Sequence, residues 1–258
     1  MQELLTHLEN GVQTITLNRP SVFNSFNRTM ALALQLELDN CALDNRIRAV
    51  VITGQGKAFC AGQDLAEATD PNGPELQKIV REHYNPIILK LRSLEKPIIA
   101  AVNGVAAGAG ANLALACDIV IAKESASFIQ AFSKIGLIPD SGGTFMLPRL
   151  VGLQKATALM LTGEKVGAKA AEQMNMIYKA IGDEEFEHFI QEFSSNIAQM
   201  PTKGLGLTKN AINSALFNDL STQLKVEEQM QTKAGKTNDF KEGVAAFLEK
   251  RQAIFKGN

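Results

Sequence analysis

The stretch that decides the fold is Asn103-Gly104-Val105-Ala106-Ala107-Gly108-Ala109-Gly110-Ala111-Asn112. It follows the β-branched run 97–102 and precedes the apolar run 113–115, so it predicts a buried strand, a tight glycine turn and the start of a helix. Small side chains leave the main-chain N–H groups at that helix start uncovered, and the helix dipole adds about half a positive charge there. We therefore expect this turn to bind a negatively charged or polarised oxygen.

Two other interpretations of the glycine turn stay open at this point. The order of strand, glycine turn and helix is also typical of a dinucleotide-binding turn. However, Leu113 occupies the position of the third glycine of that motif, and no acidic residue follows about twenty positions later. That departure argues against a nicotinamide enzyme. Alternatively, the turn serves only to let a strand and a helix pack closely.

A single carboxylate follows about thirty residues later, in Ile138-Pro139-Asp140-Ser141-Gly142-Gly143-Thr144. An oxygen held by main-chain donors beside one acid/base is the arrangement that moves a proton next to a carbonyl group. Asp140 has structural interpretations too, as a turn residue or as the cap of the next helix. The run also echoes the nucleophile segment of trypsin-like proteases, but no histidine stands in a suitable setting.

A second small-residue segment, Ala58-Phe59-Cys60-Ala61-Gly62-Gln63-Asp64-Leu65, follows another predicted strand. By itself it is an ordinary surface turn. Its interest is that sites for an oxyanion usually combine two N–H donors, and this segment offers the second.

The composition describes an ordinary globular protein of 258 residues, with 45% hydrophobic and 21% charged residues and a formal net charge of −1. This length predicts one large domain, or a domain with a small appendage. No basic stripe supports nucleic-acid binding. Three cysteines lie far apart, at Cys41, Cys60 and Cys117, so we expect reduced, buried thiols rather than disulfides or a zinc site. The start of the chain resembles no signal peptide and no run is long enough to cross a bilayer, so we expect a cytoplasmic protein.

Short apolar runs alternate with helical patterns along the first part of the chain, which favours an α/β architecture. Strands are predicted at 12–17, 49–53, 97–102 and 118–122, with helices at 28–44 and 75–94 and a long polar loop at 62–78. After residue 150 the pattern predicts helices only, at 152–162, 183–199, 203–216, 220–235 and 240–253. The last of these have apolar faces that need docking or oligomerisation to cover them.

As a set, the segments resemble the enoyl-CoA hydratase/isomerase (crotonase) superfamily over almost the whole chain. The segments that carry the resemblance are Leu17-Asn18-Arg19-Pro20, Phe59-Cys60-Ala61-Gly62-Gln63-Asp64-Leu65, Asn103-Gly104-Val105-Ala106-Ala107-Gly108, Ala116-Cys117-Asp118, Gly136-Leu137-Ile138-Pro139 and Gly142-Gly143-Thr144. The resemblance implies a crotonase fold, a spiral of ββα units over residues 1–195, followed by a helical C-terminal oligomerisation region over residues 196–258. It also implies a homotrimer or a dimer of trimers.

The resemblance further implies an acyl-CoA thioester substrate, with coenzyme A as part of the substrate and no separate cofactor or metal. By position, the backbone N–H groups of Ala61 and Ala109 form the oxyanion hole, although glycine is commoner at the second. Residues expected along the adenine of coenzyme A are Gln63, Asp64 and Leu65. Residues expected to line the acyl pocket are Asn112, Phe128, Phe132, Leu137 and Ile138.

Two departures from the family pattern decide the expected reaction. Hydratases of this family use two glutamates, and the matching positions here are Asn112 and Phe132. Neither is a carboxylate, so the resemblance points to Asp140 as the lone acid/base of an isomerase that acts on a ring-epoxide or Δ3-enoyl thioester. A hydratase with unusual residues, Asp140 acting as a nucleophile, and a non-catalytic CoA-binding protein are the alternatives.

Overall fold

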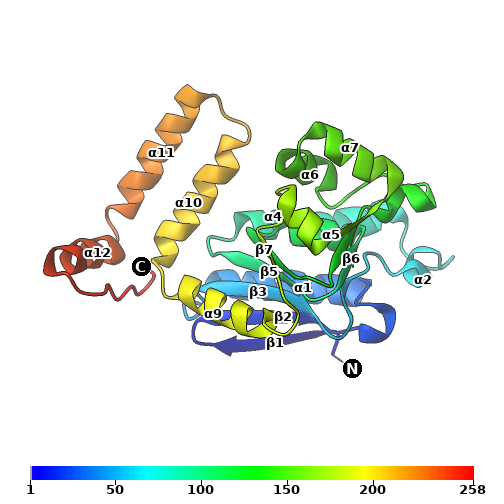
Figure 1. The fold of residues 1–258 in the computed structure, drawn as a ribbon, viewed down its shortest axis with the longest axis horizontal. Coiled ribbons are helices and arrows are strands. Elements are labelled where there is room, and N and C mark those ends of the chain that lie inside the picture. Colours follow the sequence, from blue (N-terminus) through cyan, green and yellow to red (C-terminus); the bar gives the residue numbers. More distant parts are fainter. Residues whose placement is uncertain (1) are drawn as a thin grey trace.

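Two sheets form the centre of the structure, a computed structural model that describes residues 2–258 (Figure 1). The larger sheet has the strand order β1-β2-β3-β5-β7-β10, and the smaller has the order β4-β6-β8-β9. The strands of the larger sheet are β1 Leu4–Glu9, β2 Val12–Leu17, β3 Ala49–Gly54, β5 Ile98–Val102, β7 Ile119–Lys123 and β10 Lys179–Ile181. Those of the smaller sheet are β4 Ala58–Cys60, β6 Val105–Ala107, β8 Ser127–Ile129 and β9 Lys165–Gly167.

The chain winds as a spiral, because the successive pairs β3/β4, β5/β6 and β7/β8 each give one strand to each sheet. The central strands pair in parallel, with Val51 opposite Ile99 and Ile99 opposite Ile119. Val51 and Ile99 are buried because both faces of the sheet are covered. The spiral of ββα turns that the sequence predicts is therefore present.

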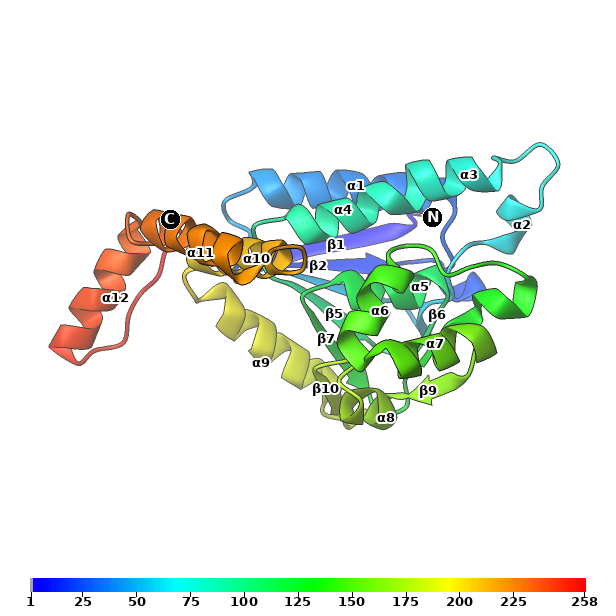
Figure 2. The same ribbon diagram turned by 90° about the horizontal axis from the view of Figure 1, so that it is seen from above.

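The helices surround the sheets and extend beyond them (Figure 2). Around the sheets lie α1 Arg28–Leu43, α2 Leu65–Ala68, α3 Leu76–Lys78, α4 Asn85–Ser93, α5 Ala109–Ala116, α6 Gly143–Val151, α7 Leu153–Thr162, α8 Ala168–Gln173 and α9 Phe186–Ala198. Further along are α10 Thr202–Ala215, α11 Leu220–Ala234 and α12 Asn238–Glu249. Three single turns complete the set, η1 Pro20–Val22, η2 Ile79–Tyr84 and η3 Ala131–Ile135.

The predicted elements differ from the structure both before and after residue 150: the strands β1 and β8 and the helix α6 were not predicted, and neither were two strands after residue 150. Only helices were expected there, yet β9 and β10 complete the two sheets. Each has three residues, too few for a periodic pattern to be visible in the sequence. The predicted helix at 75–94 is a helical run that changes to a π-helical turn at Ile79–Tyr84.

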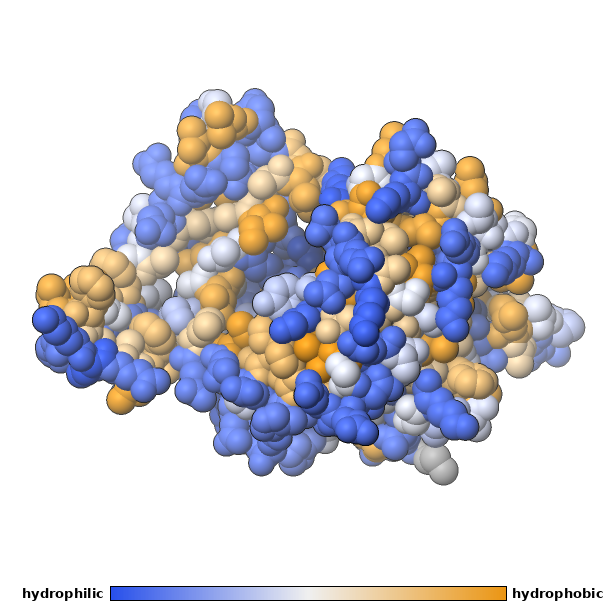
Figure 3. Space-filling model, in the orientation of Figure 1, coloured by the Kyte–Doolittle hydropathy of each residue, from blue (hydrophilic) through white to orange (hydrophobic). Residues whose placement is uncertain are grey.

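The C-terminal helices project away from the spiral (Figure 1). The helix α9 crosses residue 195 and packs on the larger sheet, whereas α10 and α11 pack mainly on each other. Docking of α10 uses Lys209, whose Nζ lies 2.8 Å from Asp118. Apolar side chains remain exposed on this part of the molecule, among them Ile212, Leu224 and Phe247. Figure 3 shows hydrophobic surface over the projecting helices.

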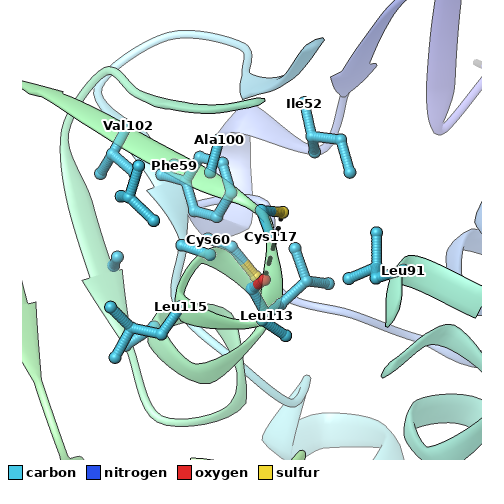
Figure 4. Packing of buried hydrophobic residues seen from close by; sticks show 14 of the residues in the cluster. Ile52, Phe59, Cys60, Leu91, Ala100, Val102, Leu113, Leu115 and Cys117 are labelled. Atoms are coloured by element: carbon cyan, nitrogen blue, oxygen red, sulfur yellow. Dashed lines mark hydrogen bonds between the residues drawn. The ribbon is translucent and has the colours of Figure 1, made fainter. Parts of the chain in front are cut away.

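The three thiols belong to the core, as the sequence predicts. Cys41, Cys60 and Cys117 are free and buried. Figure 4 shows Cys60 and Cys117 among Phe59, Leu113 and neighbouring apolar side chains. Within residues 2–258, no helix combines the length and the apolar character needed to span a bilayer.

Candidate active site

One cavity of about 240 Å³ lies beside the start of α5 and is mostly apolar. Its walls come from the segment after β4, from the helical run at 76–84 and from η3 with the turn that follows it. The lining residues are Ala61, Gly62, Gln63, Leu65, Ala68, Leu76, Ile79, Tyr84, Gly108, Ala109, Ala131, Phe132, Lys134, Ile135, Leu137 and Asp140. The cavity brings together the glycine turn, the second small-residue segment and the acid that the sequence singles out.

Ala109 is the first residue of α5, so its N–H has no acceptor inside the helix. Gly108 precedes it with φ +54° and ψ −128°, a conformation that side chains with a Cβ rarely adopt. Gly62 faces the same N–H, because a Cβ built on Gly62 would lie 3.3 Å from the Ala109 nitrogen. Glycine at both positions therefore leaves this donor accessible from the cavity.

The second expected donor, Ala61, already has an acceptor. Its N–H donates to the carbonyl oxygen of Phe23 at 3.0 Å, although Ala61 itself lines the cavity. An oxygen bound at this position must share or replace that hydrogen bond. The two main-chain donors are therefore unequal: the Ala61 N–H already has an acceptor, whereas the Ala109 N–H has none among residues 2–258.

Asp140 is the only acid among the described residues that line the cavity. Ser141 donates its hydroxyl to Oδ1 at 2.9 Å, and Ser141 itself adopts a left-handed backbone with φ +50°. Burial raises the pKa of Asp140 above its ordinary value, and the Ser141 hydrogen bond opposes that shift without cancelling it. A carboxylate with a raised pKa in an apolar cavity is a stronger base than an exposed one.

Of the three residues expected along coenzyme A, two line the cavity and one does not. Gln63 and Leu65 line the cavity, but Asp64 does not. Its carboxylate caps α2 by accepting from the Ala66 N–H at 3.0 Å and forms an ion pair with Arg19 at 2.8 Å. Asp64 therefore stabilises the segment that carries Gln63 and Leu65.

Three residues expected in the acyl pocket lie elsewhere, which corrects that part of the sequence prediction. Asn112 and Phe128 are buried and do not line the cavity. The Asn112 amide points from α5 toward the Asp140 turn, and Phe128 belongs to the hydrophobic core. Ile138 is 80% exposed, since its turn carries the side chain outward. Phe132 and Leu137 do line the cavity.

Tyr84 and Lys134 are part of the lining without having been predicted from the sequence. Tyr84 is almost fully buried, and its hydroxyl donates to Oε1 of Gln63 at 3.0 Å. Burial raises the pKa of Tyr84 well above its ordinary value, so the phenol stays neutral. The only sequence signal was a tyrosine on the apolar face of a predicted helix, which is usually a core position.

The described residues contain no group of three or more His, Cys, Asp or Glu side chains placed to hold a metal ion. The arrangement that remains is a main-chain donor at a helix start and one half-buried carboxylate, and both residues line an apolar cavity. Such a site can stabilise an oxyanion and transfer a proton to and from a neighbouring carbon.

This spiral and site define a crotonase-fold protein. The chain matches the enoyl-CoA hydratase/isomerase family over residues 7–258 and belongs to that family. Its relatives include the 1,2-epoxyphenylacetyl-CoA isomerase of Escherichia coli, 49% identical over 100% of this chain and 99% of that protein. A probable enoyl-CoA hydratase of Rhodobacter capsulatus is 44% identical over 97% of this chain and 96% of that protein.

Solved structures of the same family have the same fold. An enoyl-CoA hydratase from Bacillus anthracis superposes with a TM-score of 0.92 at 34% identity and covers 100% of both chains. A putative enoyl-CoA hydratase/isomerase from Mycobacterium abscessus gives the same TM-score and identity over 99% of this chain and 100% of that one.

Proposed function

We propose that this protein is an acyl-CoA isomerase that moves a proton, and with it a double bond, through a thioester enolate. The observation that carries the proposal is that Asp140 is the only carboxylate among the described lining residues, in the cavity that the free Ala109 N–H faces. Isomerisation needs one acid/base, because the group that takes a proton from one carbon can return it to another.

In the proposed mechanism the thioester oxygen accepts a hydrogen bond from the Ala109 N–H, at the positive end of α5. The Ala61 N–H contributes when its bond to Phe23 is shared or released. The Asp140 carboxylate removes a proton from a carbon of the acyl group, and the C–H electron pair becomes the enolate. The resulting carboxylic acid returns the proton at another carbon of the conjugated system, which restores Asp140.

The preferred substrate in this proposal is ring 1,2-epoxyphenylacetyl-CoA, converted to oxepin-CoA, with Δ3-to-Δ2 enoyl-CoA isomerisation as a further activity. In the ring reaction the C–C bond bridged by the epoxide oxygen breaks and its electron pair joins the ring π system, while Asp140 carries the proton from the acyl methylene to a ring carbon, so no atom is gained or lost. The similarity to the Escherichia coli isomerase supports this choice, and so does an apolar cavity with Phe132 in its wall. In this proposal Gln63 and Leu65 bind the coenzyme A portion at the mouth of the cavity.

The test compares Asp140→Asn with the wild type on a Δ3-enoyl-CoA thioester. Turnover should fall by roughly 10²–10⁴-fold, the usual contribution of a positioned acid/base, while binding of butyryl-CoA is retained. Asp183→Asn is the matched control, because Asp183 also accepts from a serine hydroxyl but lies outside the cavity. Equal turnover in Asp140→Asn and wild type would remove Asp140 from the reaction.

A hydratase is the second candidate, because the relatives also include the 2,3-dehydroadipyl-CoA hydratase of Escherichia coli at 35% identity. Against it stands the absence of a second carboxylate among the described lining residues. Incubation with crotonyl-CoA in ¹⁸O-labelled water separates the candidates, since only a hydratase builds the label into a hydroxyacyl product.

We also propose a homotrimer, or a dimer of trimers, held by the C-terminal helices. Exposed apolar side chains on α10 to α12 support it, since Phe247 is 83% exposed and Ile212 and Leu224 are also accessible. Light scattering coupled to gel filtration gives the mass directly. A monomer at micromolar concentration would contradict this part of the proposal.

A further inference from the structure

The Asn112 amide lies behind the cavity wall, where it connects α5 to the Asp140 turn. It is 1% exposed and is not part of the cavity lining. Its Nδ2 donates to the main-chain oxygen of Asp140 at 2.8 Å, and its Oδ1 accepts from Nε2 of Gln130 at 2.8 Å. Asn112 therefore cannot touch a bound acyl group, but it holds the backbone of the residue that can.

These two hydrogen bonds, Gln130 to Asn112 and Asn112 to Asp140, form a relay whose direction is set by the donor and acceptor groups at its two ends. The Asp140 carbonyl can only accept, so Asn112 must turn its NH2 group toward it. The amide oxygen then faces Gln130, which must donate. A reversed amide would place two acceptors against each other at Asp140 and two donors against each other at Gln130.

The helix α6 begins with a glycine, Gly143, which leaves space for the Asn112 amide. The N–H of Gly143 donates to the same Asp140 oxygen at 2.9 Å, and a Cβ on Gly143 would lie only 2.3 Å from Nδ2 of Asn112. The next residue after Asp140 has the left-handed backbone noted above, which requires support from the surroundings. Two donors on one carbonyl supply that support.

We propose that Asn112 is a positioning residue for the reaction, acting through the main chain of Asp140. Asn112 and Ala109 belong to the same helix, three residues apart. One short helix therefore supplies the oxyanion donor and also fixes the turn that carries the acid/base. The distance between the two reactive groups is set inside α5 rather than by the loops around the cavity. This inference rests on the proposed function of Asp140.

The first test is Asn112→Ala, assayed for turnover of the Δ3-enoyl-CoA thioester and for binding of butyryl-CoA. We expect kcat to fall about 10–100-fold, the range that follows from a displacement of about 1 Å in a reacting group, with the butyryl-CoA Kd within about threefold. Asn213→Ala is the control, because Asn213 also donates its amide to a main-chain oxygen, that of Arg92 at 2.9 Å, but outside the cavity. The control should keep wild-type kcat.

The second test reverses the relay with Gln130→Glu, which leaves the size of the side chain unchanged. An ionised carboxylate at position 130 can only accept, so Asn112 must turn its NH2 group toward it and present an oxygen to the Asp140 carbonyl. Because position 130 is buried, kcat is measured at a pH high enough to ionise the new carboxyl. We expect a loss of kcat of about 10-fold or more at a residue that contacts neither substrate nor Asp140. Gln130→Met, which removes the donor without adding charge, should lose less.

The double variant Asn112→Ala/Asp140→Asn distinguishes a positioning role of Asn112 from a general loss of structure at the site. If Asn112 acts through Asp140, then adding Asn112→Ala to Asp140→Asn lowers the residual turnover no further, because the two effects are not independent. A full additional 10–100-fold loss would overturn the proposal. Wild-type kcat in both Asn112→Ala and Gln130→Glu would also overturn it. If Asn112→Ala does not fold, the two Gln130 variants test the proposal by themselves, because it requires a larger loss of kcat in Gln130→Glu than in Gln130→Met.

Failure of this inference is distinguishable from failure of the proposed function. An active Asp140→Asn variant defeats the proposed function itself. An inactive Asp140→Asn variant together with fully active Asn112 and Gln130 variants defeats only the positioning role.

Discussion

The two walls of the cavity are built in opposite ways. One wall, formed by Ala109 and Asp140, is held by main-chain geometry and by the buried amide of Asn112. The other, formed by residues 65–79, consists of short helical turns whose apolar side chains are partly exposed, with Leu65 at 53% and Leu76 at 47%. We propose that the first wall performs the chemistry, while the second adapts to the acyl group.

Their sequences reflect the same division. The first wall depends on residues without a side chain, since Gly62 leaves room for the Ala109 N–H and Gly143 leaves room for the Asn112 amide. Gly108 supplies a backbone conformation at φ +54° that other residues rarely adopt. The second wall depends on side-chain size and apolar surface. Substitutions should therefore lower kcat in the first wall and raise KM in the second.

The largest effect in this comparison is expected at Gly62. A Cβ at this position would lie 3.0 Å from the Ala107 oxygen and 3.3 Å from the Ala109 nitrogen, at φ +91°. Gly62→Ala should obstruct the free donor and lower kcat by about 10²–10³-fold, the usual cost of losing one oxyanion donor. Gly56→Ala has similar backbone strain, at φ +78°, but lies outside the cavity. Equal losses in both variants would attribute the effect to strain alone.

An intermediate effect is expected at Leu76, in the second wall. Leu76→Ala removes apolar surface that contacts the acyl group in the proposed complex. We expect KM to rise about 3–10-fold with kcat within about twofold, since a half-exposed side chain loses contacts equivalent to about one buried methylene group, roughly 0.8 kcal/mol. Steady-state kinetics on acyl chains of two lengths check the prediction. Leu153→Ala, at an exposed position outside the cavity, should leave both constants unchanged.

The smallest effect concerns the contribution of Asp140, the proposed acid/base, to the stability of the fold. Because burial raises the pKa of Asp140, the folded chain holds that proton more tightly than the unfolded chain does. As pH rises from below the ordinary pKa through the raised one, the unfolded state loses its proton first, so the folded state is destabilised.

Asp140→Asn removes this destabilisation, so the variant should unfold at a Tm about 1–3 °C above the wild type at pH 7. Near about pH 3, where the carboxyl is protonated in both states, the difference should vanish. Calorimetry at the two pH values measures it. A variant less stable than wild type at pH 7 would show that the carboxylate contributes favourable contacts instead.

Much of the fold could be predicted because long periodic segments and buried β-branched runs identify their elements directly. The strand at β3, the helix α1 and the helices α9 to α12 follow from such patterns. The strands β9 and β10 could not be predicted, since three residues contain no period and their pairing is set by the rest of the sheet.

At the site, the sequence identified Asp140 and the helix start at Ala109, because glycine turns and a lone acid are visible as residue types. It could not show which way a side chain points. Asn112 faces the Asp140 turn rather than the acyl pocket, and Ile138 faces outward. Nor could it show that the Ala61 N–H has an acceptor in Phe23, which depends on contacts between distant segments.

The buried thiols have a practical consequence for experiments on this protein. Burial raises the pKa of Cys41, Cys60 and Cys117 to about 12 each, so at neutral pH almost no thiolate exists to react with a maleimide or an oxidant. A single cysteine introduced on the surface would therefore be the one reactive thiol in the native chain. Fluorophores or spin labels can be attached to α2 or α12 without first removing the native cysteines.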